Sequence, residues 1–488
     1  MSATASDRRW TRIFVLAVAA YFTAQVVLRL WLGGAYETDE AEMVAMTPGL
    51  RLGYGPQLPL YNWLQLGLFQ LFGRGLFALS LMKQLLLAGV CLFAFAAFRL
   101  WLPARIAVAG AAALILVPDI AWEAERATTH SNIMLAAAAL ALWAAGALAR
   151  AGLAGRAGWR HALALGLALG IGGLSKYNFW LVPVALLLAG LTLSRLRRLI
   201  LAPRGLGALA LAAAVAALVM AAPMAWLVAE ARVALSSTAK LDIGGGRFAG
   251  LPDVATGLVA LLILPALVAG GLRLAGRGAP APAGDAALWL AWLARAAAIA
   301  AGLVVIGVVA AGMGAVTSRW MLPVAVLAAP AMVMAAALRA PRGPTVTAGL
   351  ALLLGLAVMA GLGYDRWKPG ARRDVDFRTL PAIVEGIAPP TVPVAVEFYA
   401  AGNLLRWAPG REVKPLLPFV ARAFGAGPVL FLLRETTPRE LGDAIVQAGW
   451  PAGAGRLLSQ GSFTLPYLTD DATMPFRWAL VDMPGVAP

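Results

Sequence analysis

The chain has 488 residues, of which 61% are hydrophobic and 13% are charged, and its formal net charge is +16. Its mean hydropathy is +0.79, and its apolar runs are long enough to cross a hydrocarbon core of about 30 Å, which excludes a soluble globule and indicates a polytopic α-helical membrane protein. The basic residues fall mostly in short loops between these runs, as in cytoplasmic loops, so the charge does not indicate nucleic-acid binding.

About eleven transmembrane helices are predicted over residues 1–363. The first is long enough to be retained as a helix rather than cleaved as a signal sequence. The expected spans are residues 13–32, 76–98, 106–122, 131–149, 161–174, 178–193, 205–228, 254–272, 286–311, 319–338 and 344–363.

Arginine and lysine residues mark alternate loops as cytoplasmic, so the loops between them are expected on the outer side of the membrane. A bacterial inner-membrane protein is expected, with its outer loops on the periplasmic side. These loops are residues 33–75, 119–130, 175–178, 229–253 and 313–318.

An odd number of spans also places everything after Tyr364 on the outer side. There charged residues and prolines return, and β-prone runs at 392–399 and 428–433 alternate with helical candidates at 377–387 and 438–448. This pattern predicts a small extracytoplasmic α/β domain over residues 364–488. Selection of the acceptor and simple capping of the membrane region are both open roles for it.

The first outer loop concentrates carboxylates, which are scarce in this chain. Asp39, Glu40 and Glu42 fall within four positions, and a proline-rich aromatic segment with Gln57 and Tyr61 follows. A positioned carboxylate can take a proton from a hydroxyl, so the loop suggests chemistry at the membrane surface. The structural alternative is that Asp39 caps a short helix.

Further polar residues gather on the predicted outer side, where charges at membrane depth usually mark a site or a pathway. Two of these groups also have purely structural interpretations. Glu123 or Glu125 could form a surface salt bridge with Arg126, and the Lys83 side chain could extend from a helix end to the membrane surface. The residues are Lys83, Asp119, Glu123, Glu125, Arg126, His130, Lys176, Tyr177, Asn178, Lys240, Asp242, Arg247, Arg319 and Trp320.

Four segments, in this order and on this side, resemble the membrane-embedded GT-C glycosyltransferases, in particular the group of protein O-mannosyltransferases and lipid A aminoarabinose transferases. The resemblance covers most of residues 1–363. The segments are Thr38-Asp39-Glu40-Ala41, Pro59-Leu60-Tyr61-Asn62-Trp63-Leu64, Gly173-Leu174-Ser175-Lys176-Tyr177-Asn178 and Arg319-Trp320-Met321-Leu322-Pro323.

The resemblance implies transfer of a sugar from a polyprenyl-phosphate carrier to a lipid A or other glycolipid, polysaccharide or protein acceptor. Asp39 would be the general base, with Glu40 in a supporting role. Cationic side chains suit the leaving phosphate, namely Lys83, Arg126, Lys176 and Arg319. Residues expected to line the substrate site are Gln57, Tyr61, Glu123, Glu125, His130, Tyr177 and Asn178.

One departure from the family pattern concerns the phosphate. Relatives commonly carry His or Lys just before the Pro-Leu-Tyr segment, where this chain has Gln57 and Leu58. Lys83 is the candidate replacement. No cofactor is implied with certainty, and a divalent metal requirement stays open. The alternative function is a lipid or solute transporter or flippase, although the sequence has no matching halves.

Overall fold

The computed structural model describes residues 4–127, 130–156, 158–234, 236, 242–244, 246–417, 420–435 and 440–485. Lys240 and the first residues of the helix expected at 438–448 lie outside these ranges. The chain divides into two compact units. The first comprises Met1–Gln25, Pro56–Tyr61 and Lys83–Met359, and the second Val26–Gly55, Asn62–Met82 and Ala360–Pro488.

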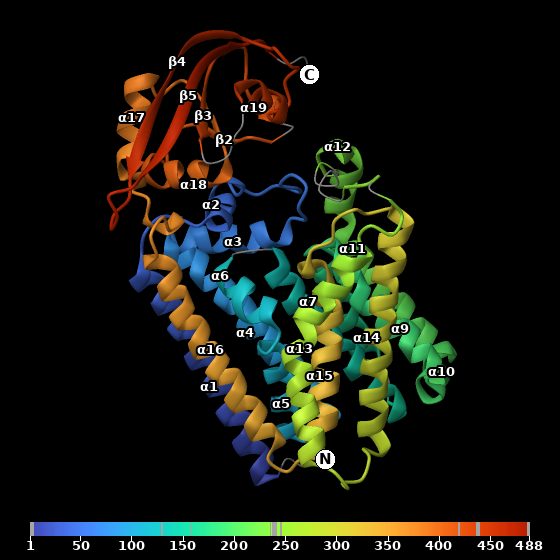
Figure 1. Ribbon diagram of the computed structural model, residues 1–488. Helices are drawn as coiled ribbons and strands as arrows, with labels where there is room; N and C mark the ends of the chain where they lie inside the picture. Colours follow the sequence, from blue (N-terminus) through green and yellow to red (C-terminus); the bar gives the residue numbers. More distant parts are fainter. Residues whose placement is uncertain are drawn as a thin grey trace. The chain divides into compact units, whose positions relative to one another are not determined.

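Helices account for most of the chain before residue 368, and Figure 1 shows them in sequence colours. In chain order they are α1 (Ala5–Leu32), α2 (Thr38–Ala45), α3 (Leu60–Phe72), α4 (Leu76–Arg99), α5 (Ala104–Ile115), η1 (Asp119–Glu123), α6 (Ala124–Arg126), α7 (His130–Leu153), α8 (Trp159–Gly173), η2 (Tyr177–Trp180), α9 (Leu181–Thr192), α10 (Ser194–Leu201), α11 (Pro203–Ala229), α12 (Ala231–Ala234), α13 (Leu251–Ala275), α14 (Gly284–Ala311), η4 (Ser318–Met321), α15 (Leu322–Ala337) and α16 (Gly343–Trp367).

The predicted class, a polytopic helical protein with a small C-terminal sheet, is confirmed, and the number of spans is lower than expected. Within the described residues, eight helices are long and apolar enough to cross a membrane, or ten if each of two bent pairs counts as one span. The bends are 75° between Ala104–Ile115 and Asp119–Arg126, and 108° between Tyr177–Thr192 and Ser194–Leu201. The expected span at 161–174 is α8, whose 15 residues are fewer than the roughly 20 that a crossing needs.

The core of the first unit surrounds α15. This helix is built largely from Ala, Val and Leu, and it packs against α5, α13 and α14. In the span Ser318–Ala337, 83% of the most apolar window is buried, compared with 11% in α11. Because small side chains allow neighbouring helices to approach closely, α15 forms a rigid centre. That centre carries η4, and therefore Arg319, at its N-terminal end.

The C-terminal part of the second unit is a five-stranded mixed sheet. Its strand order is β2-β1-β3-β5-β4, with β1 parallel to β2 and β3, and β5 antiparallel to β3 and β4. The elements are η5 (Arg372–Asp374), η6 (Phe377–Thr379), α17 (Leu380–Ile387), β1 (Val394–Val396), α18 (Phe398–Trp407), β2 (Val413–Pro415), η7 (Val420–Ala423), β3 (Gly427–Arg434), α19 (Leu441–Gln447), β4 (Arg456–Pro466) and β5 (Thr473–Met483).

Side chains of alternating residues in β3 enter two different cores, one on each face of the sheet. Leu430 and Leu432 join a cluster with α17 and α18, whereas Phe431 and Leu433 join one with α19. Figure 1 shows α17 and α19 on opposite sides of the sheet. The expected strands and helices correspond to β1, β3, α17 and α19. The long hairpin of β4 and β5 was not predicted.

Candidate active site

Asp39 is the second residue of the short helix α2 in the second unit. Its side chain is partly buried, and Glu37 is the residue that caps the helix. A carboxylate in the first turn of a helix is favoured by the unpaired backbone N–H groups there. A short helix is therefore present as expected, but the prediction that Asp39 caps it is wrong, because Glu37 is the capping residue and Asp39 lies inside the helix. A chemical role for Asp39 is still open.

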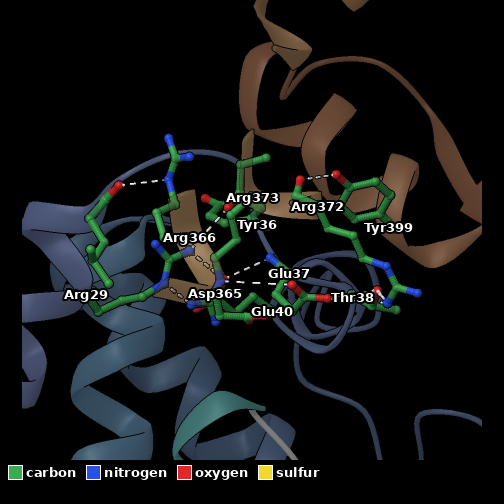
Figure 2. Close-up of polar contacts among 12 residues, drawn as sticks. Arg29, Tyr36, Glu37, Thr38, Glu40, Asp365, Arg366, Arg372, Arg373 and Tyr399 are labelled. Atoms are coloured by element: carbon green, nitrogen blue, oxygen red, sulfur yellow. Dashed lines mark hydrogen bonds and ion pairs between the residues drawn. The ribbon is translucent and has the colours of Figure 1, made fainter. Parts of the chain in front are cut away.

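Glu40, the next residue of α2, is 1% exposed. Its Oε1 accepts a hydrogen bond from Arg29 Nε at 2.8 Å, and its Oε2 accepts one from Arg29 Nη2 at 2.6 Å (Figure 2). The Glu37 N–H also donates to Oε2, at 2.9 Å. Both oxygens of Glu40 are thus engaged inside the protein, in the two-pronged geometry that makes an Arg–carboxylate pair strong.

Arg29 also fixes the chain that leads into α2. Its guanidinium donates to the carbonyl oxygens of Gly33 at 2.7 Å and Ala35 at 3.2 Å. Gly34, between them, has a φ of +78°, and a Cβ there would collide with the Arg373 carbonyl oxygen. Only glycine fits this turn, so the path from α1 to α2 is tightly determined.

Two further arginines surround the start of α2. Arg372 Nη1 lies 3.4 Å from Glu37 Oε1 and 3.2 Å from Thr38 Oγ1, with about half of its side chain exposed. Arg373 is buried, with Nε 4.0 Å from Glu37 Oε2. Burial, followed by the charge of Arg29, lowers the pKa of Arg373. Arg29, Arg372 and Arg373 were not among the site residues predicted from the sequence, although Arg29 is a rare charge inside a predicted span.

A second polar group lies in the first unit and includes three of the predicted site residues. Glu123 Oε2 accepts hydrogen bonds from Arg319 Nη2 at 2.7 Å and Arg126 Nη2 at 3.2 Å. The hydroxyl of Ser318 donates to Asp119 Oδ2 at 2.6 Å. These contacts join η1 and α6 to η4, which come from distant parts of the sequence. The proposed surface pair of Glu123 with Arg126 is present, and Arg319 shares it.

Lys176 adds another cation to this group. Its Nζ donates to Ser131 Oγ at 2.9 Å, and the neighbouring Asn178 donates through Nδ2 to the Trp320 carbonyl oxygen at 3.2 Å. Burial and, second, the charge of Arg319 lower the pKa of Lys176 to about 8. Lys176 and Arg319 therefore lie close enough for their charges to repel each other, an arrangement that an anion between them would relieve.

Lys83 and Glu125 form a separate buried contact. Lys83 Nζ donates to the backbone oxygen of Glu125 at 2.5 Å, and Gln84 Nε2 donates to Glu125 Oε2 at 2.7 Å. Lys83 and Glu125 are 2% and 3% exposed. These hydrogen bonds connect α4 to α6, which also carries Arg126. Lys83 thus supports the backbone beside the Glu123 group through its contact with Glu125.

The remaining predicted site residues differ in exposure. The rings of Tyr61 and His130 lie 5.3 Å apart, with Tyr61 fully buried and His130 partly buried. Gln57 is partly buried, and Tyr177 is 49% exposed. Within the described part of the chain, no three His, Cys, Asp or Glu side chains come together in a way that could hold a metal ion.

Comparison with known proteins gives matches along the whole chain. The family model for dolichyl-phosphate-mannose-protein mannosyltransferase matches residues 55–226. The lipopolysaccharide core galacturonosyltransferase RgtA of Rhizobium johnstonii is 31% identical over 504 aligned positions, which cover 95% of this chain and 96% of that protein. RgtB of the same organism is 32% identical, and its alignment covers 66% of this chain and 64% of RgtB.

Solved structures of ArnT from Cupriavidus metallidurans share the fold. The undecaprenyl-phosphate-bound structure has a TM-score of 0.58 and 16% sequence identity, and the match covers 96% of this chain and 98% of that one. The apo structure has a TM-score of 0.60, at the same identity, over 98% of both chains. These matches confirm the resemblance inferred from the four sequence segments.

Proposed function

The chain belongs to the GT-C glycosyltransferase family that includes the lipopolysaccharide core galacturonosyltransferases, and on this premise we propose that it transfers a uronic acid from a polyprenyl-phosphate carrier to a sugar of the lipopolysaccharide core. The observation that carries the proposal is the similarity to RgtA over nearly the full length of both chains. A transporter would not be expected to keep this similarity along its whole length, so the transferase is favoured.

The cations around Glu123 are the proposed site for the donor phosphate. Lys176, Arg126 and Arg319 provide three positive charges, and Asp119 and Glu123 provide two negative ones, which leaves a surplus of one. A polyprenyl phosphodiester carries one negative charge and matches that surplus. Charge-assisted hydrogen bonds to phosphate are also about twice as strong as neutral ones. Undecaprenyl phosphate in the ArnT structure supports the same class of carrier.

Asp39 is the proposed general base. It takes the proton from an acceptor hydroxyl while that oxygen bonds to the anomeric carbon of the sugar, and the bond between this carbon and the carrier phosphate breaks. The products are the glycosylated acceptor and the polyprenyl phosphate, whose charge the cations stabilise. Glu40 takes no part in the proton transfer, because both of its oxygens are committed to Arg29 and to Glu37 N–H.

The reaction is placed on the periplasmic side of the bacterial inner membrane. The distribution of Arg and Lys supports this side for residues 33–75, which carry Asp39, and for the turn with Lys176. Acceptor sugars of the lipopolysaccharide core and lipid-linked donors would meet there.

The first test measures the lipid product in cells. Mass spectrometry of envelope lipids is compared between cells with and without the gene, and the expected loss is one hexuronic acid on the lipopolysaccharide core. Loss of a different sugar would replace the proposed donor, and an unchanged lipid profile with altered uptake of a solute would favour the transporter.

The second test measures donor use by the purified protein. Lys176→Met and Arg319→Gln are expected to raise the KM for the polyprenyl-linked donor about 10- to 100-fold, since each removes a charge-assisted contact of about 1.5–3 kcal/mol. The matched control is Arg277→Gln, which removes an exposed arginine from a predicted cytoplasmic loop. An unchanged KM in both variants would remove the phosphate role from this group.

A further inference from the structure

Helix α18 of the C-terminal region packs directly against α2, the helix that carries Asp39. Both helices belong to the second unit. At their contact lies Gly402, where a Cβ would collide with the backbone of Ala41. Any larger residue would push the two helices apart, so the close approach depends on this glycine.

The next residue of α18, Asn403, holds the chain that leads into α2 by two hydrogen bonds. Its Oδ1 accepts from the Tyr36 N–H at 2.8 Å, and its Nδ2 donates to the Tyr36 carbonyl oxygen at 3.1 Å. Asn403 is 0% exposed, and its Nδ2 also donates to the Tyr399 carbonyl oxygen at 2.8 Å. A buried amide with these three bonds has no freedom to turn.

Arg406 of α18 contacts the same segment directly, and Tyr399 contacts it through Arg372. Arg406 Nη1 donates to the Gly34 carbonyl oxygen at 2.8 Å, and its guanidinium lies 4.8 Å from the centre of the Tyr36 ring. The hydroxyl of Tyr399 donates to the carbonyl oxygen of Arg372, the residue beside Thr38. Successive turns of α18 therefore contact the chain on both sides of Asp39's position in the sequence.

Arg29 holds this segment from α1. It donates to the carbonyl oxygens of Gly33 and Ala35 and pairs with Glu40, while α18 holds Gly34, Tyr36 and Ala41. Residues 33–36 and Ala41, on both sides of Asp39 in the sequence, are thus each contacted by Arg29 or by α18. Asp39 is the carboxylate in this stretch whose side chain is only partly buried.

We infer that α18 is a catalytic support: Asn403 and Gly402 are positioning residues that hold Asp39 in the geometry needed for proton transfer. The inference rests on the proposed role of Asp39 as general base. It assigns the C-terminal region a part in the chemical step itself, since a displacement of about 1 Å at a reacting group can lower turnover about 100-fold. It also distinguishes this region from one that only selects the acceptor.

The test uses the full-length purified protein with two substitutions of graded effect. Asn403→Asp keeps an acceptor for the Tyr36 N–H and loses the donor to its carbonyl oxygen, whereas Asn403→Leu loses both and has a similar size. We expect kcat to fall about 10-fold and about 100-fold, respectively, with the donor KM unchanged. The control is Arg456→Gln, which removes a mostly exposed side chain on β4 and should leave kcat unchanged.

Hydrogen exchange distinguishes a local loosening around α2 from a loss of stability in the whole protein. In Asn403→Leu, backbone amides of residues 33–46 should exchange faster, while those of β3 and β5 keep their protection. Gly402→Ala should reproduce both the kinetic and the exchange effects, because it separates α18 from α2 without removing a hydrogen bond.

Three results would overturn the inference. One is a lower melting temperature with unchanged kcat per folded molecule, which would make the contact purely structural. Another is a raised KM for the acceptor with unchanged kcat, which would assign α18 to acceptor binding. The third is full activity in every α18 variant. Asp39→Asn, measured beside them, separates the two proposals: if that variant keeps its turnover, the general base itself is wrong.

Discussion

Glu40→Gln should destabilise the protein, and the structure indicates by how much. The substitution removes the charge that neutralises Arg29, whose side chain is 5% exposed, and it places an amide N–H where an oxygen accepted a hydrogen bond. Breaking a buried ion pair from one side costs about 3–5 kcal/mol. Arg29 keeps its bonds to Gly33 and Ala35, so the lower end, about 3 kcal/mol, is expected, which lowers the melting temperature of a 488-residue chain by about 3 °C.

Asp39→Asn should leave the stability almost unchanged and should instead lower the turnover. Asp39 is only partly buried in the first turn of α2, where a carboxylate contributes about 0.3–1 kcal/mol. Its melting temperature should therefore stay close to that of the parent protein. Asparagine cannot take the proton of the acceptor, so turnover should fall by about 10²- to 10⁴-fold.

The assay compares both variants in detergent by thermal unfolding and by sugar transfer from a purified donor. If Glu40→Gln kept the parental stability but lost turnover, the structural role assigned to Glu40 would be wrong, and Glu40 would be the reacting carboxylate. A double variant, Arg29→Met with Glu40→Met, removes both charges and should recover much of the lost stability, because an apolar pair often replaces a buried ion pair without cost.

The remaining predictions concern pH and topology. Lys176 carries its proton below about pH 8, so kcat/KM for the donor should fall as the pH rises through 8, and Lys176→Arg should keep it constant to higher pH because arginine stays charged. Parallel pH profiles for the two proteins would contradict this role. Reporter proteins fused after Gly53 and after Gly402 should be active only as extracytoplasmic reporters, and a cytoplasmic signal from either would displace the proposed active site from the periplasmic side.

Much of the helical region could be predicted from the sequence, because apolar length identifies the helices that are long enough to cross a membrane. The side assigned to each loop from its charge stays a prediction. The span predicted at residues 161–174 is the exception. The corresponding helix α8 is apolar but only 15 residues long, and apolar composition alone does not distinguish a crossing helix from a shorter one packed among its neighbours. The unpredicted hairpin of β4 and β5 has a similar reason. Most residues of β4 are exposed, so no clear alternation of apolar and polar residues marks it.

The candidate site could be predicted only in part. The carboxylates of residues 33–75 and the cations of later loops were recognisable as candidates by residue type and by their predicted side of the membrane. Pairings over long sequence separations were not, since Arg319 meets Glu123 across 196 positions and Asn403 meets Tyr36 across 367. Asn403 carries no charge and lies in an ordinary amphipathic helix, so composition gives no signal for it. Arg29 did give one, as a charge within a predicted span.

Adjacent carboxylates can take different roles here because they lie on a helix. Consecutive residues of an α-helix point about 100° apart, so Glu40 can be buried against Arg29 while Asp39 lies on a different side of the helix and is only partly buried. The buried member holds the first turn in place, and the partly buried Asp39 is the proposed general base. On this view the two acids form one unit in which rigidity at position 40 makes the geometry at position 39 reproducible, and α18 supplies the same rigidity from the other side of the chain.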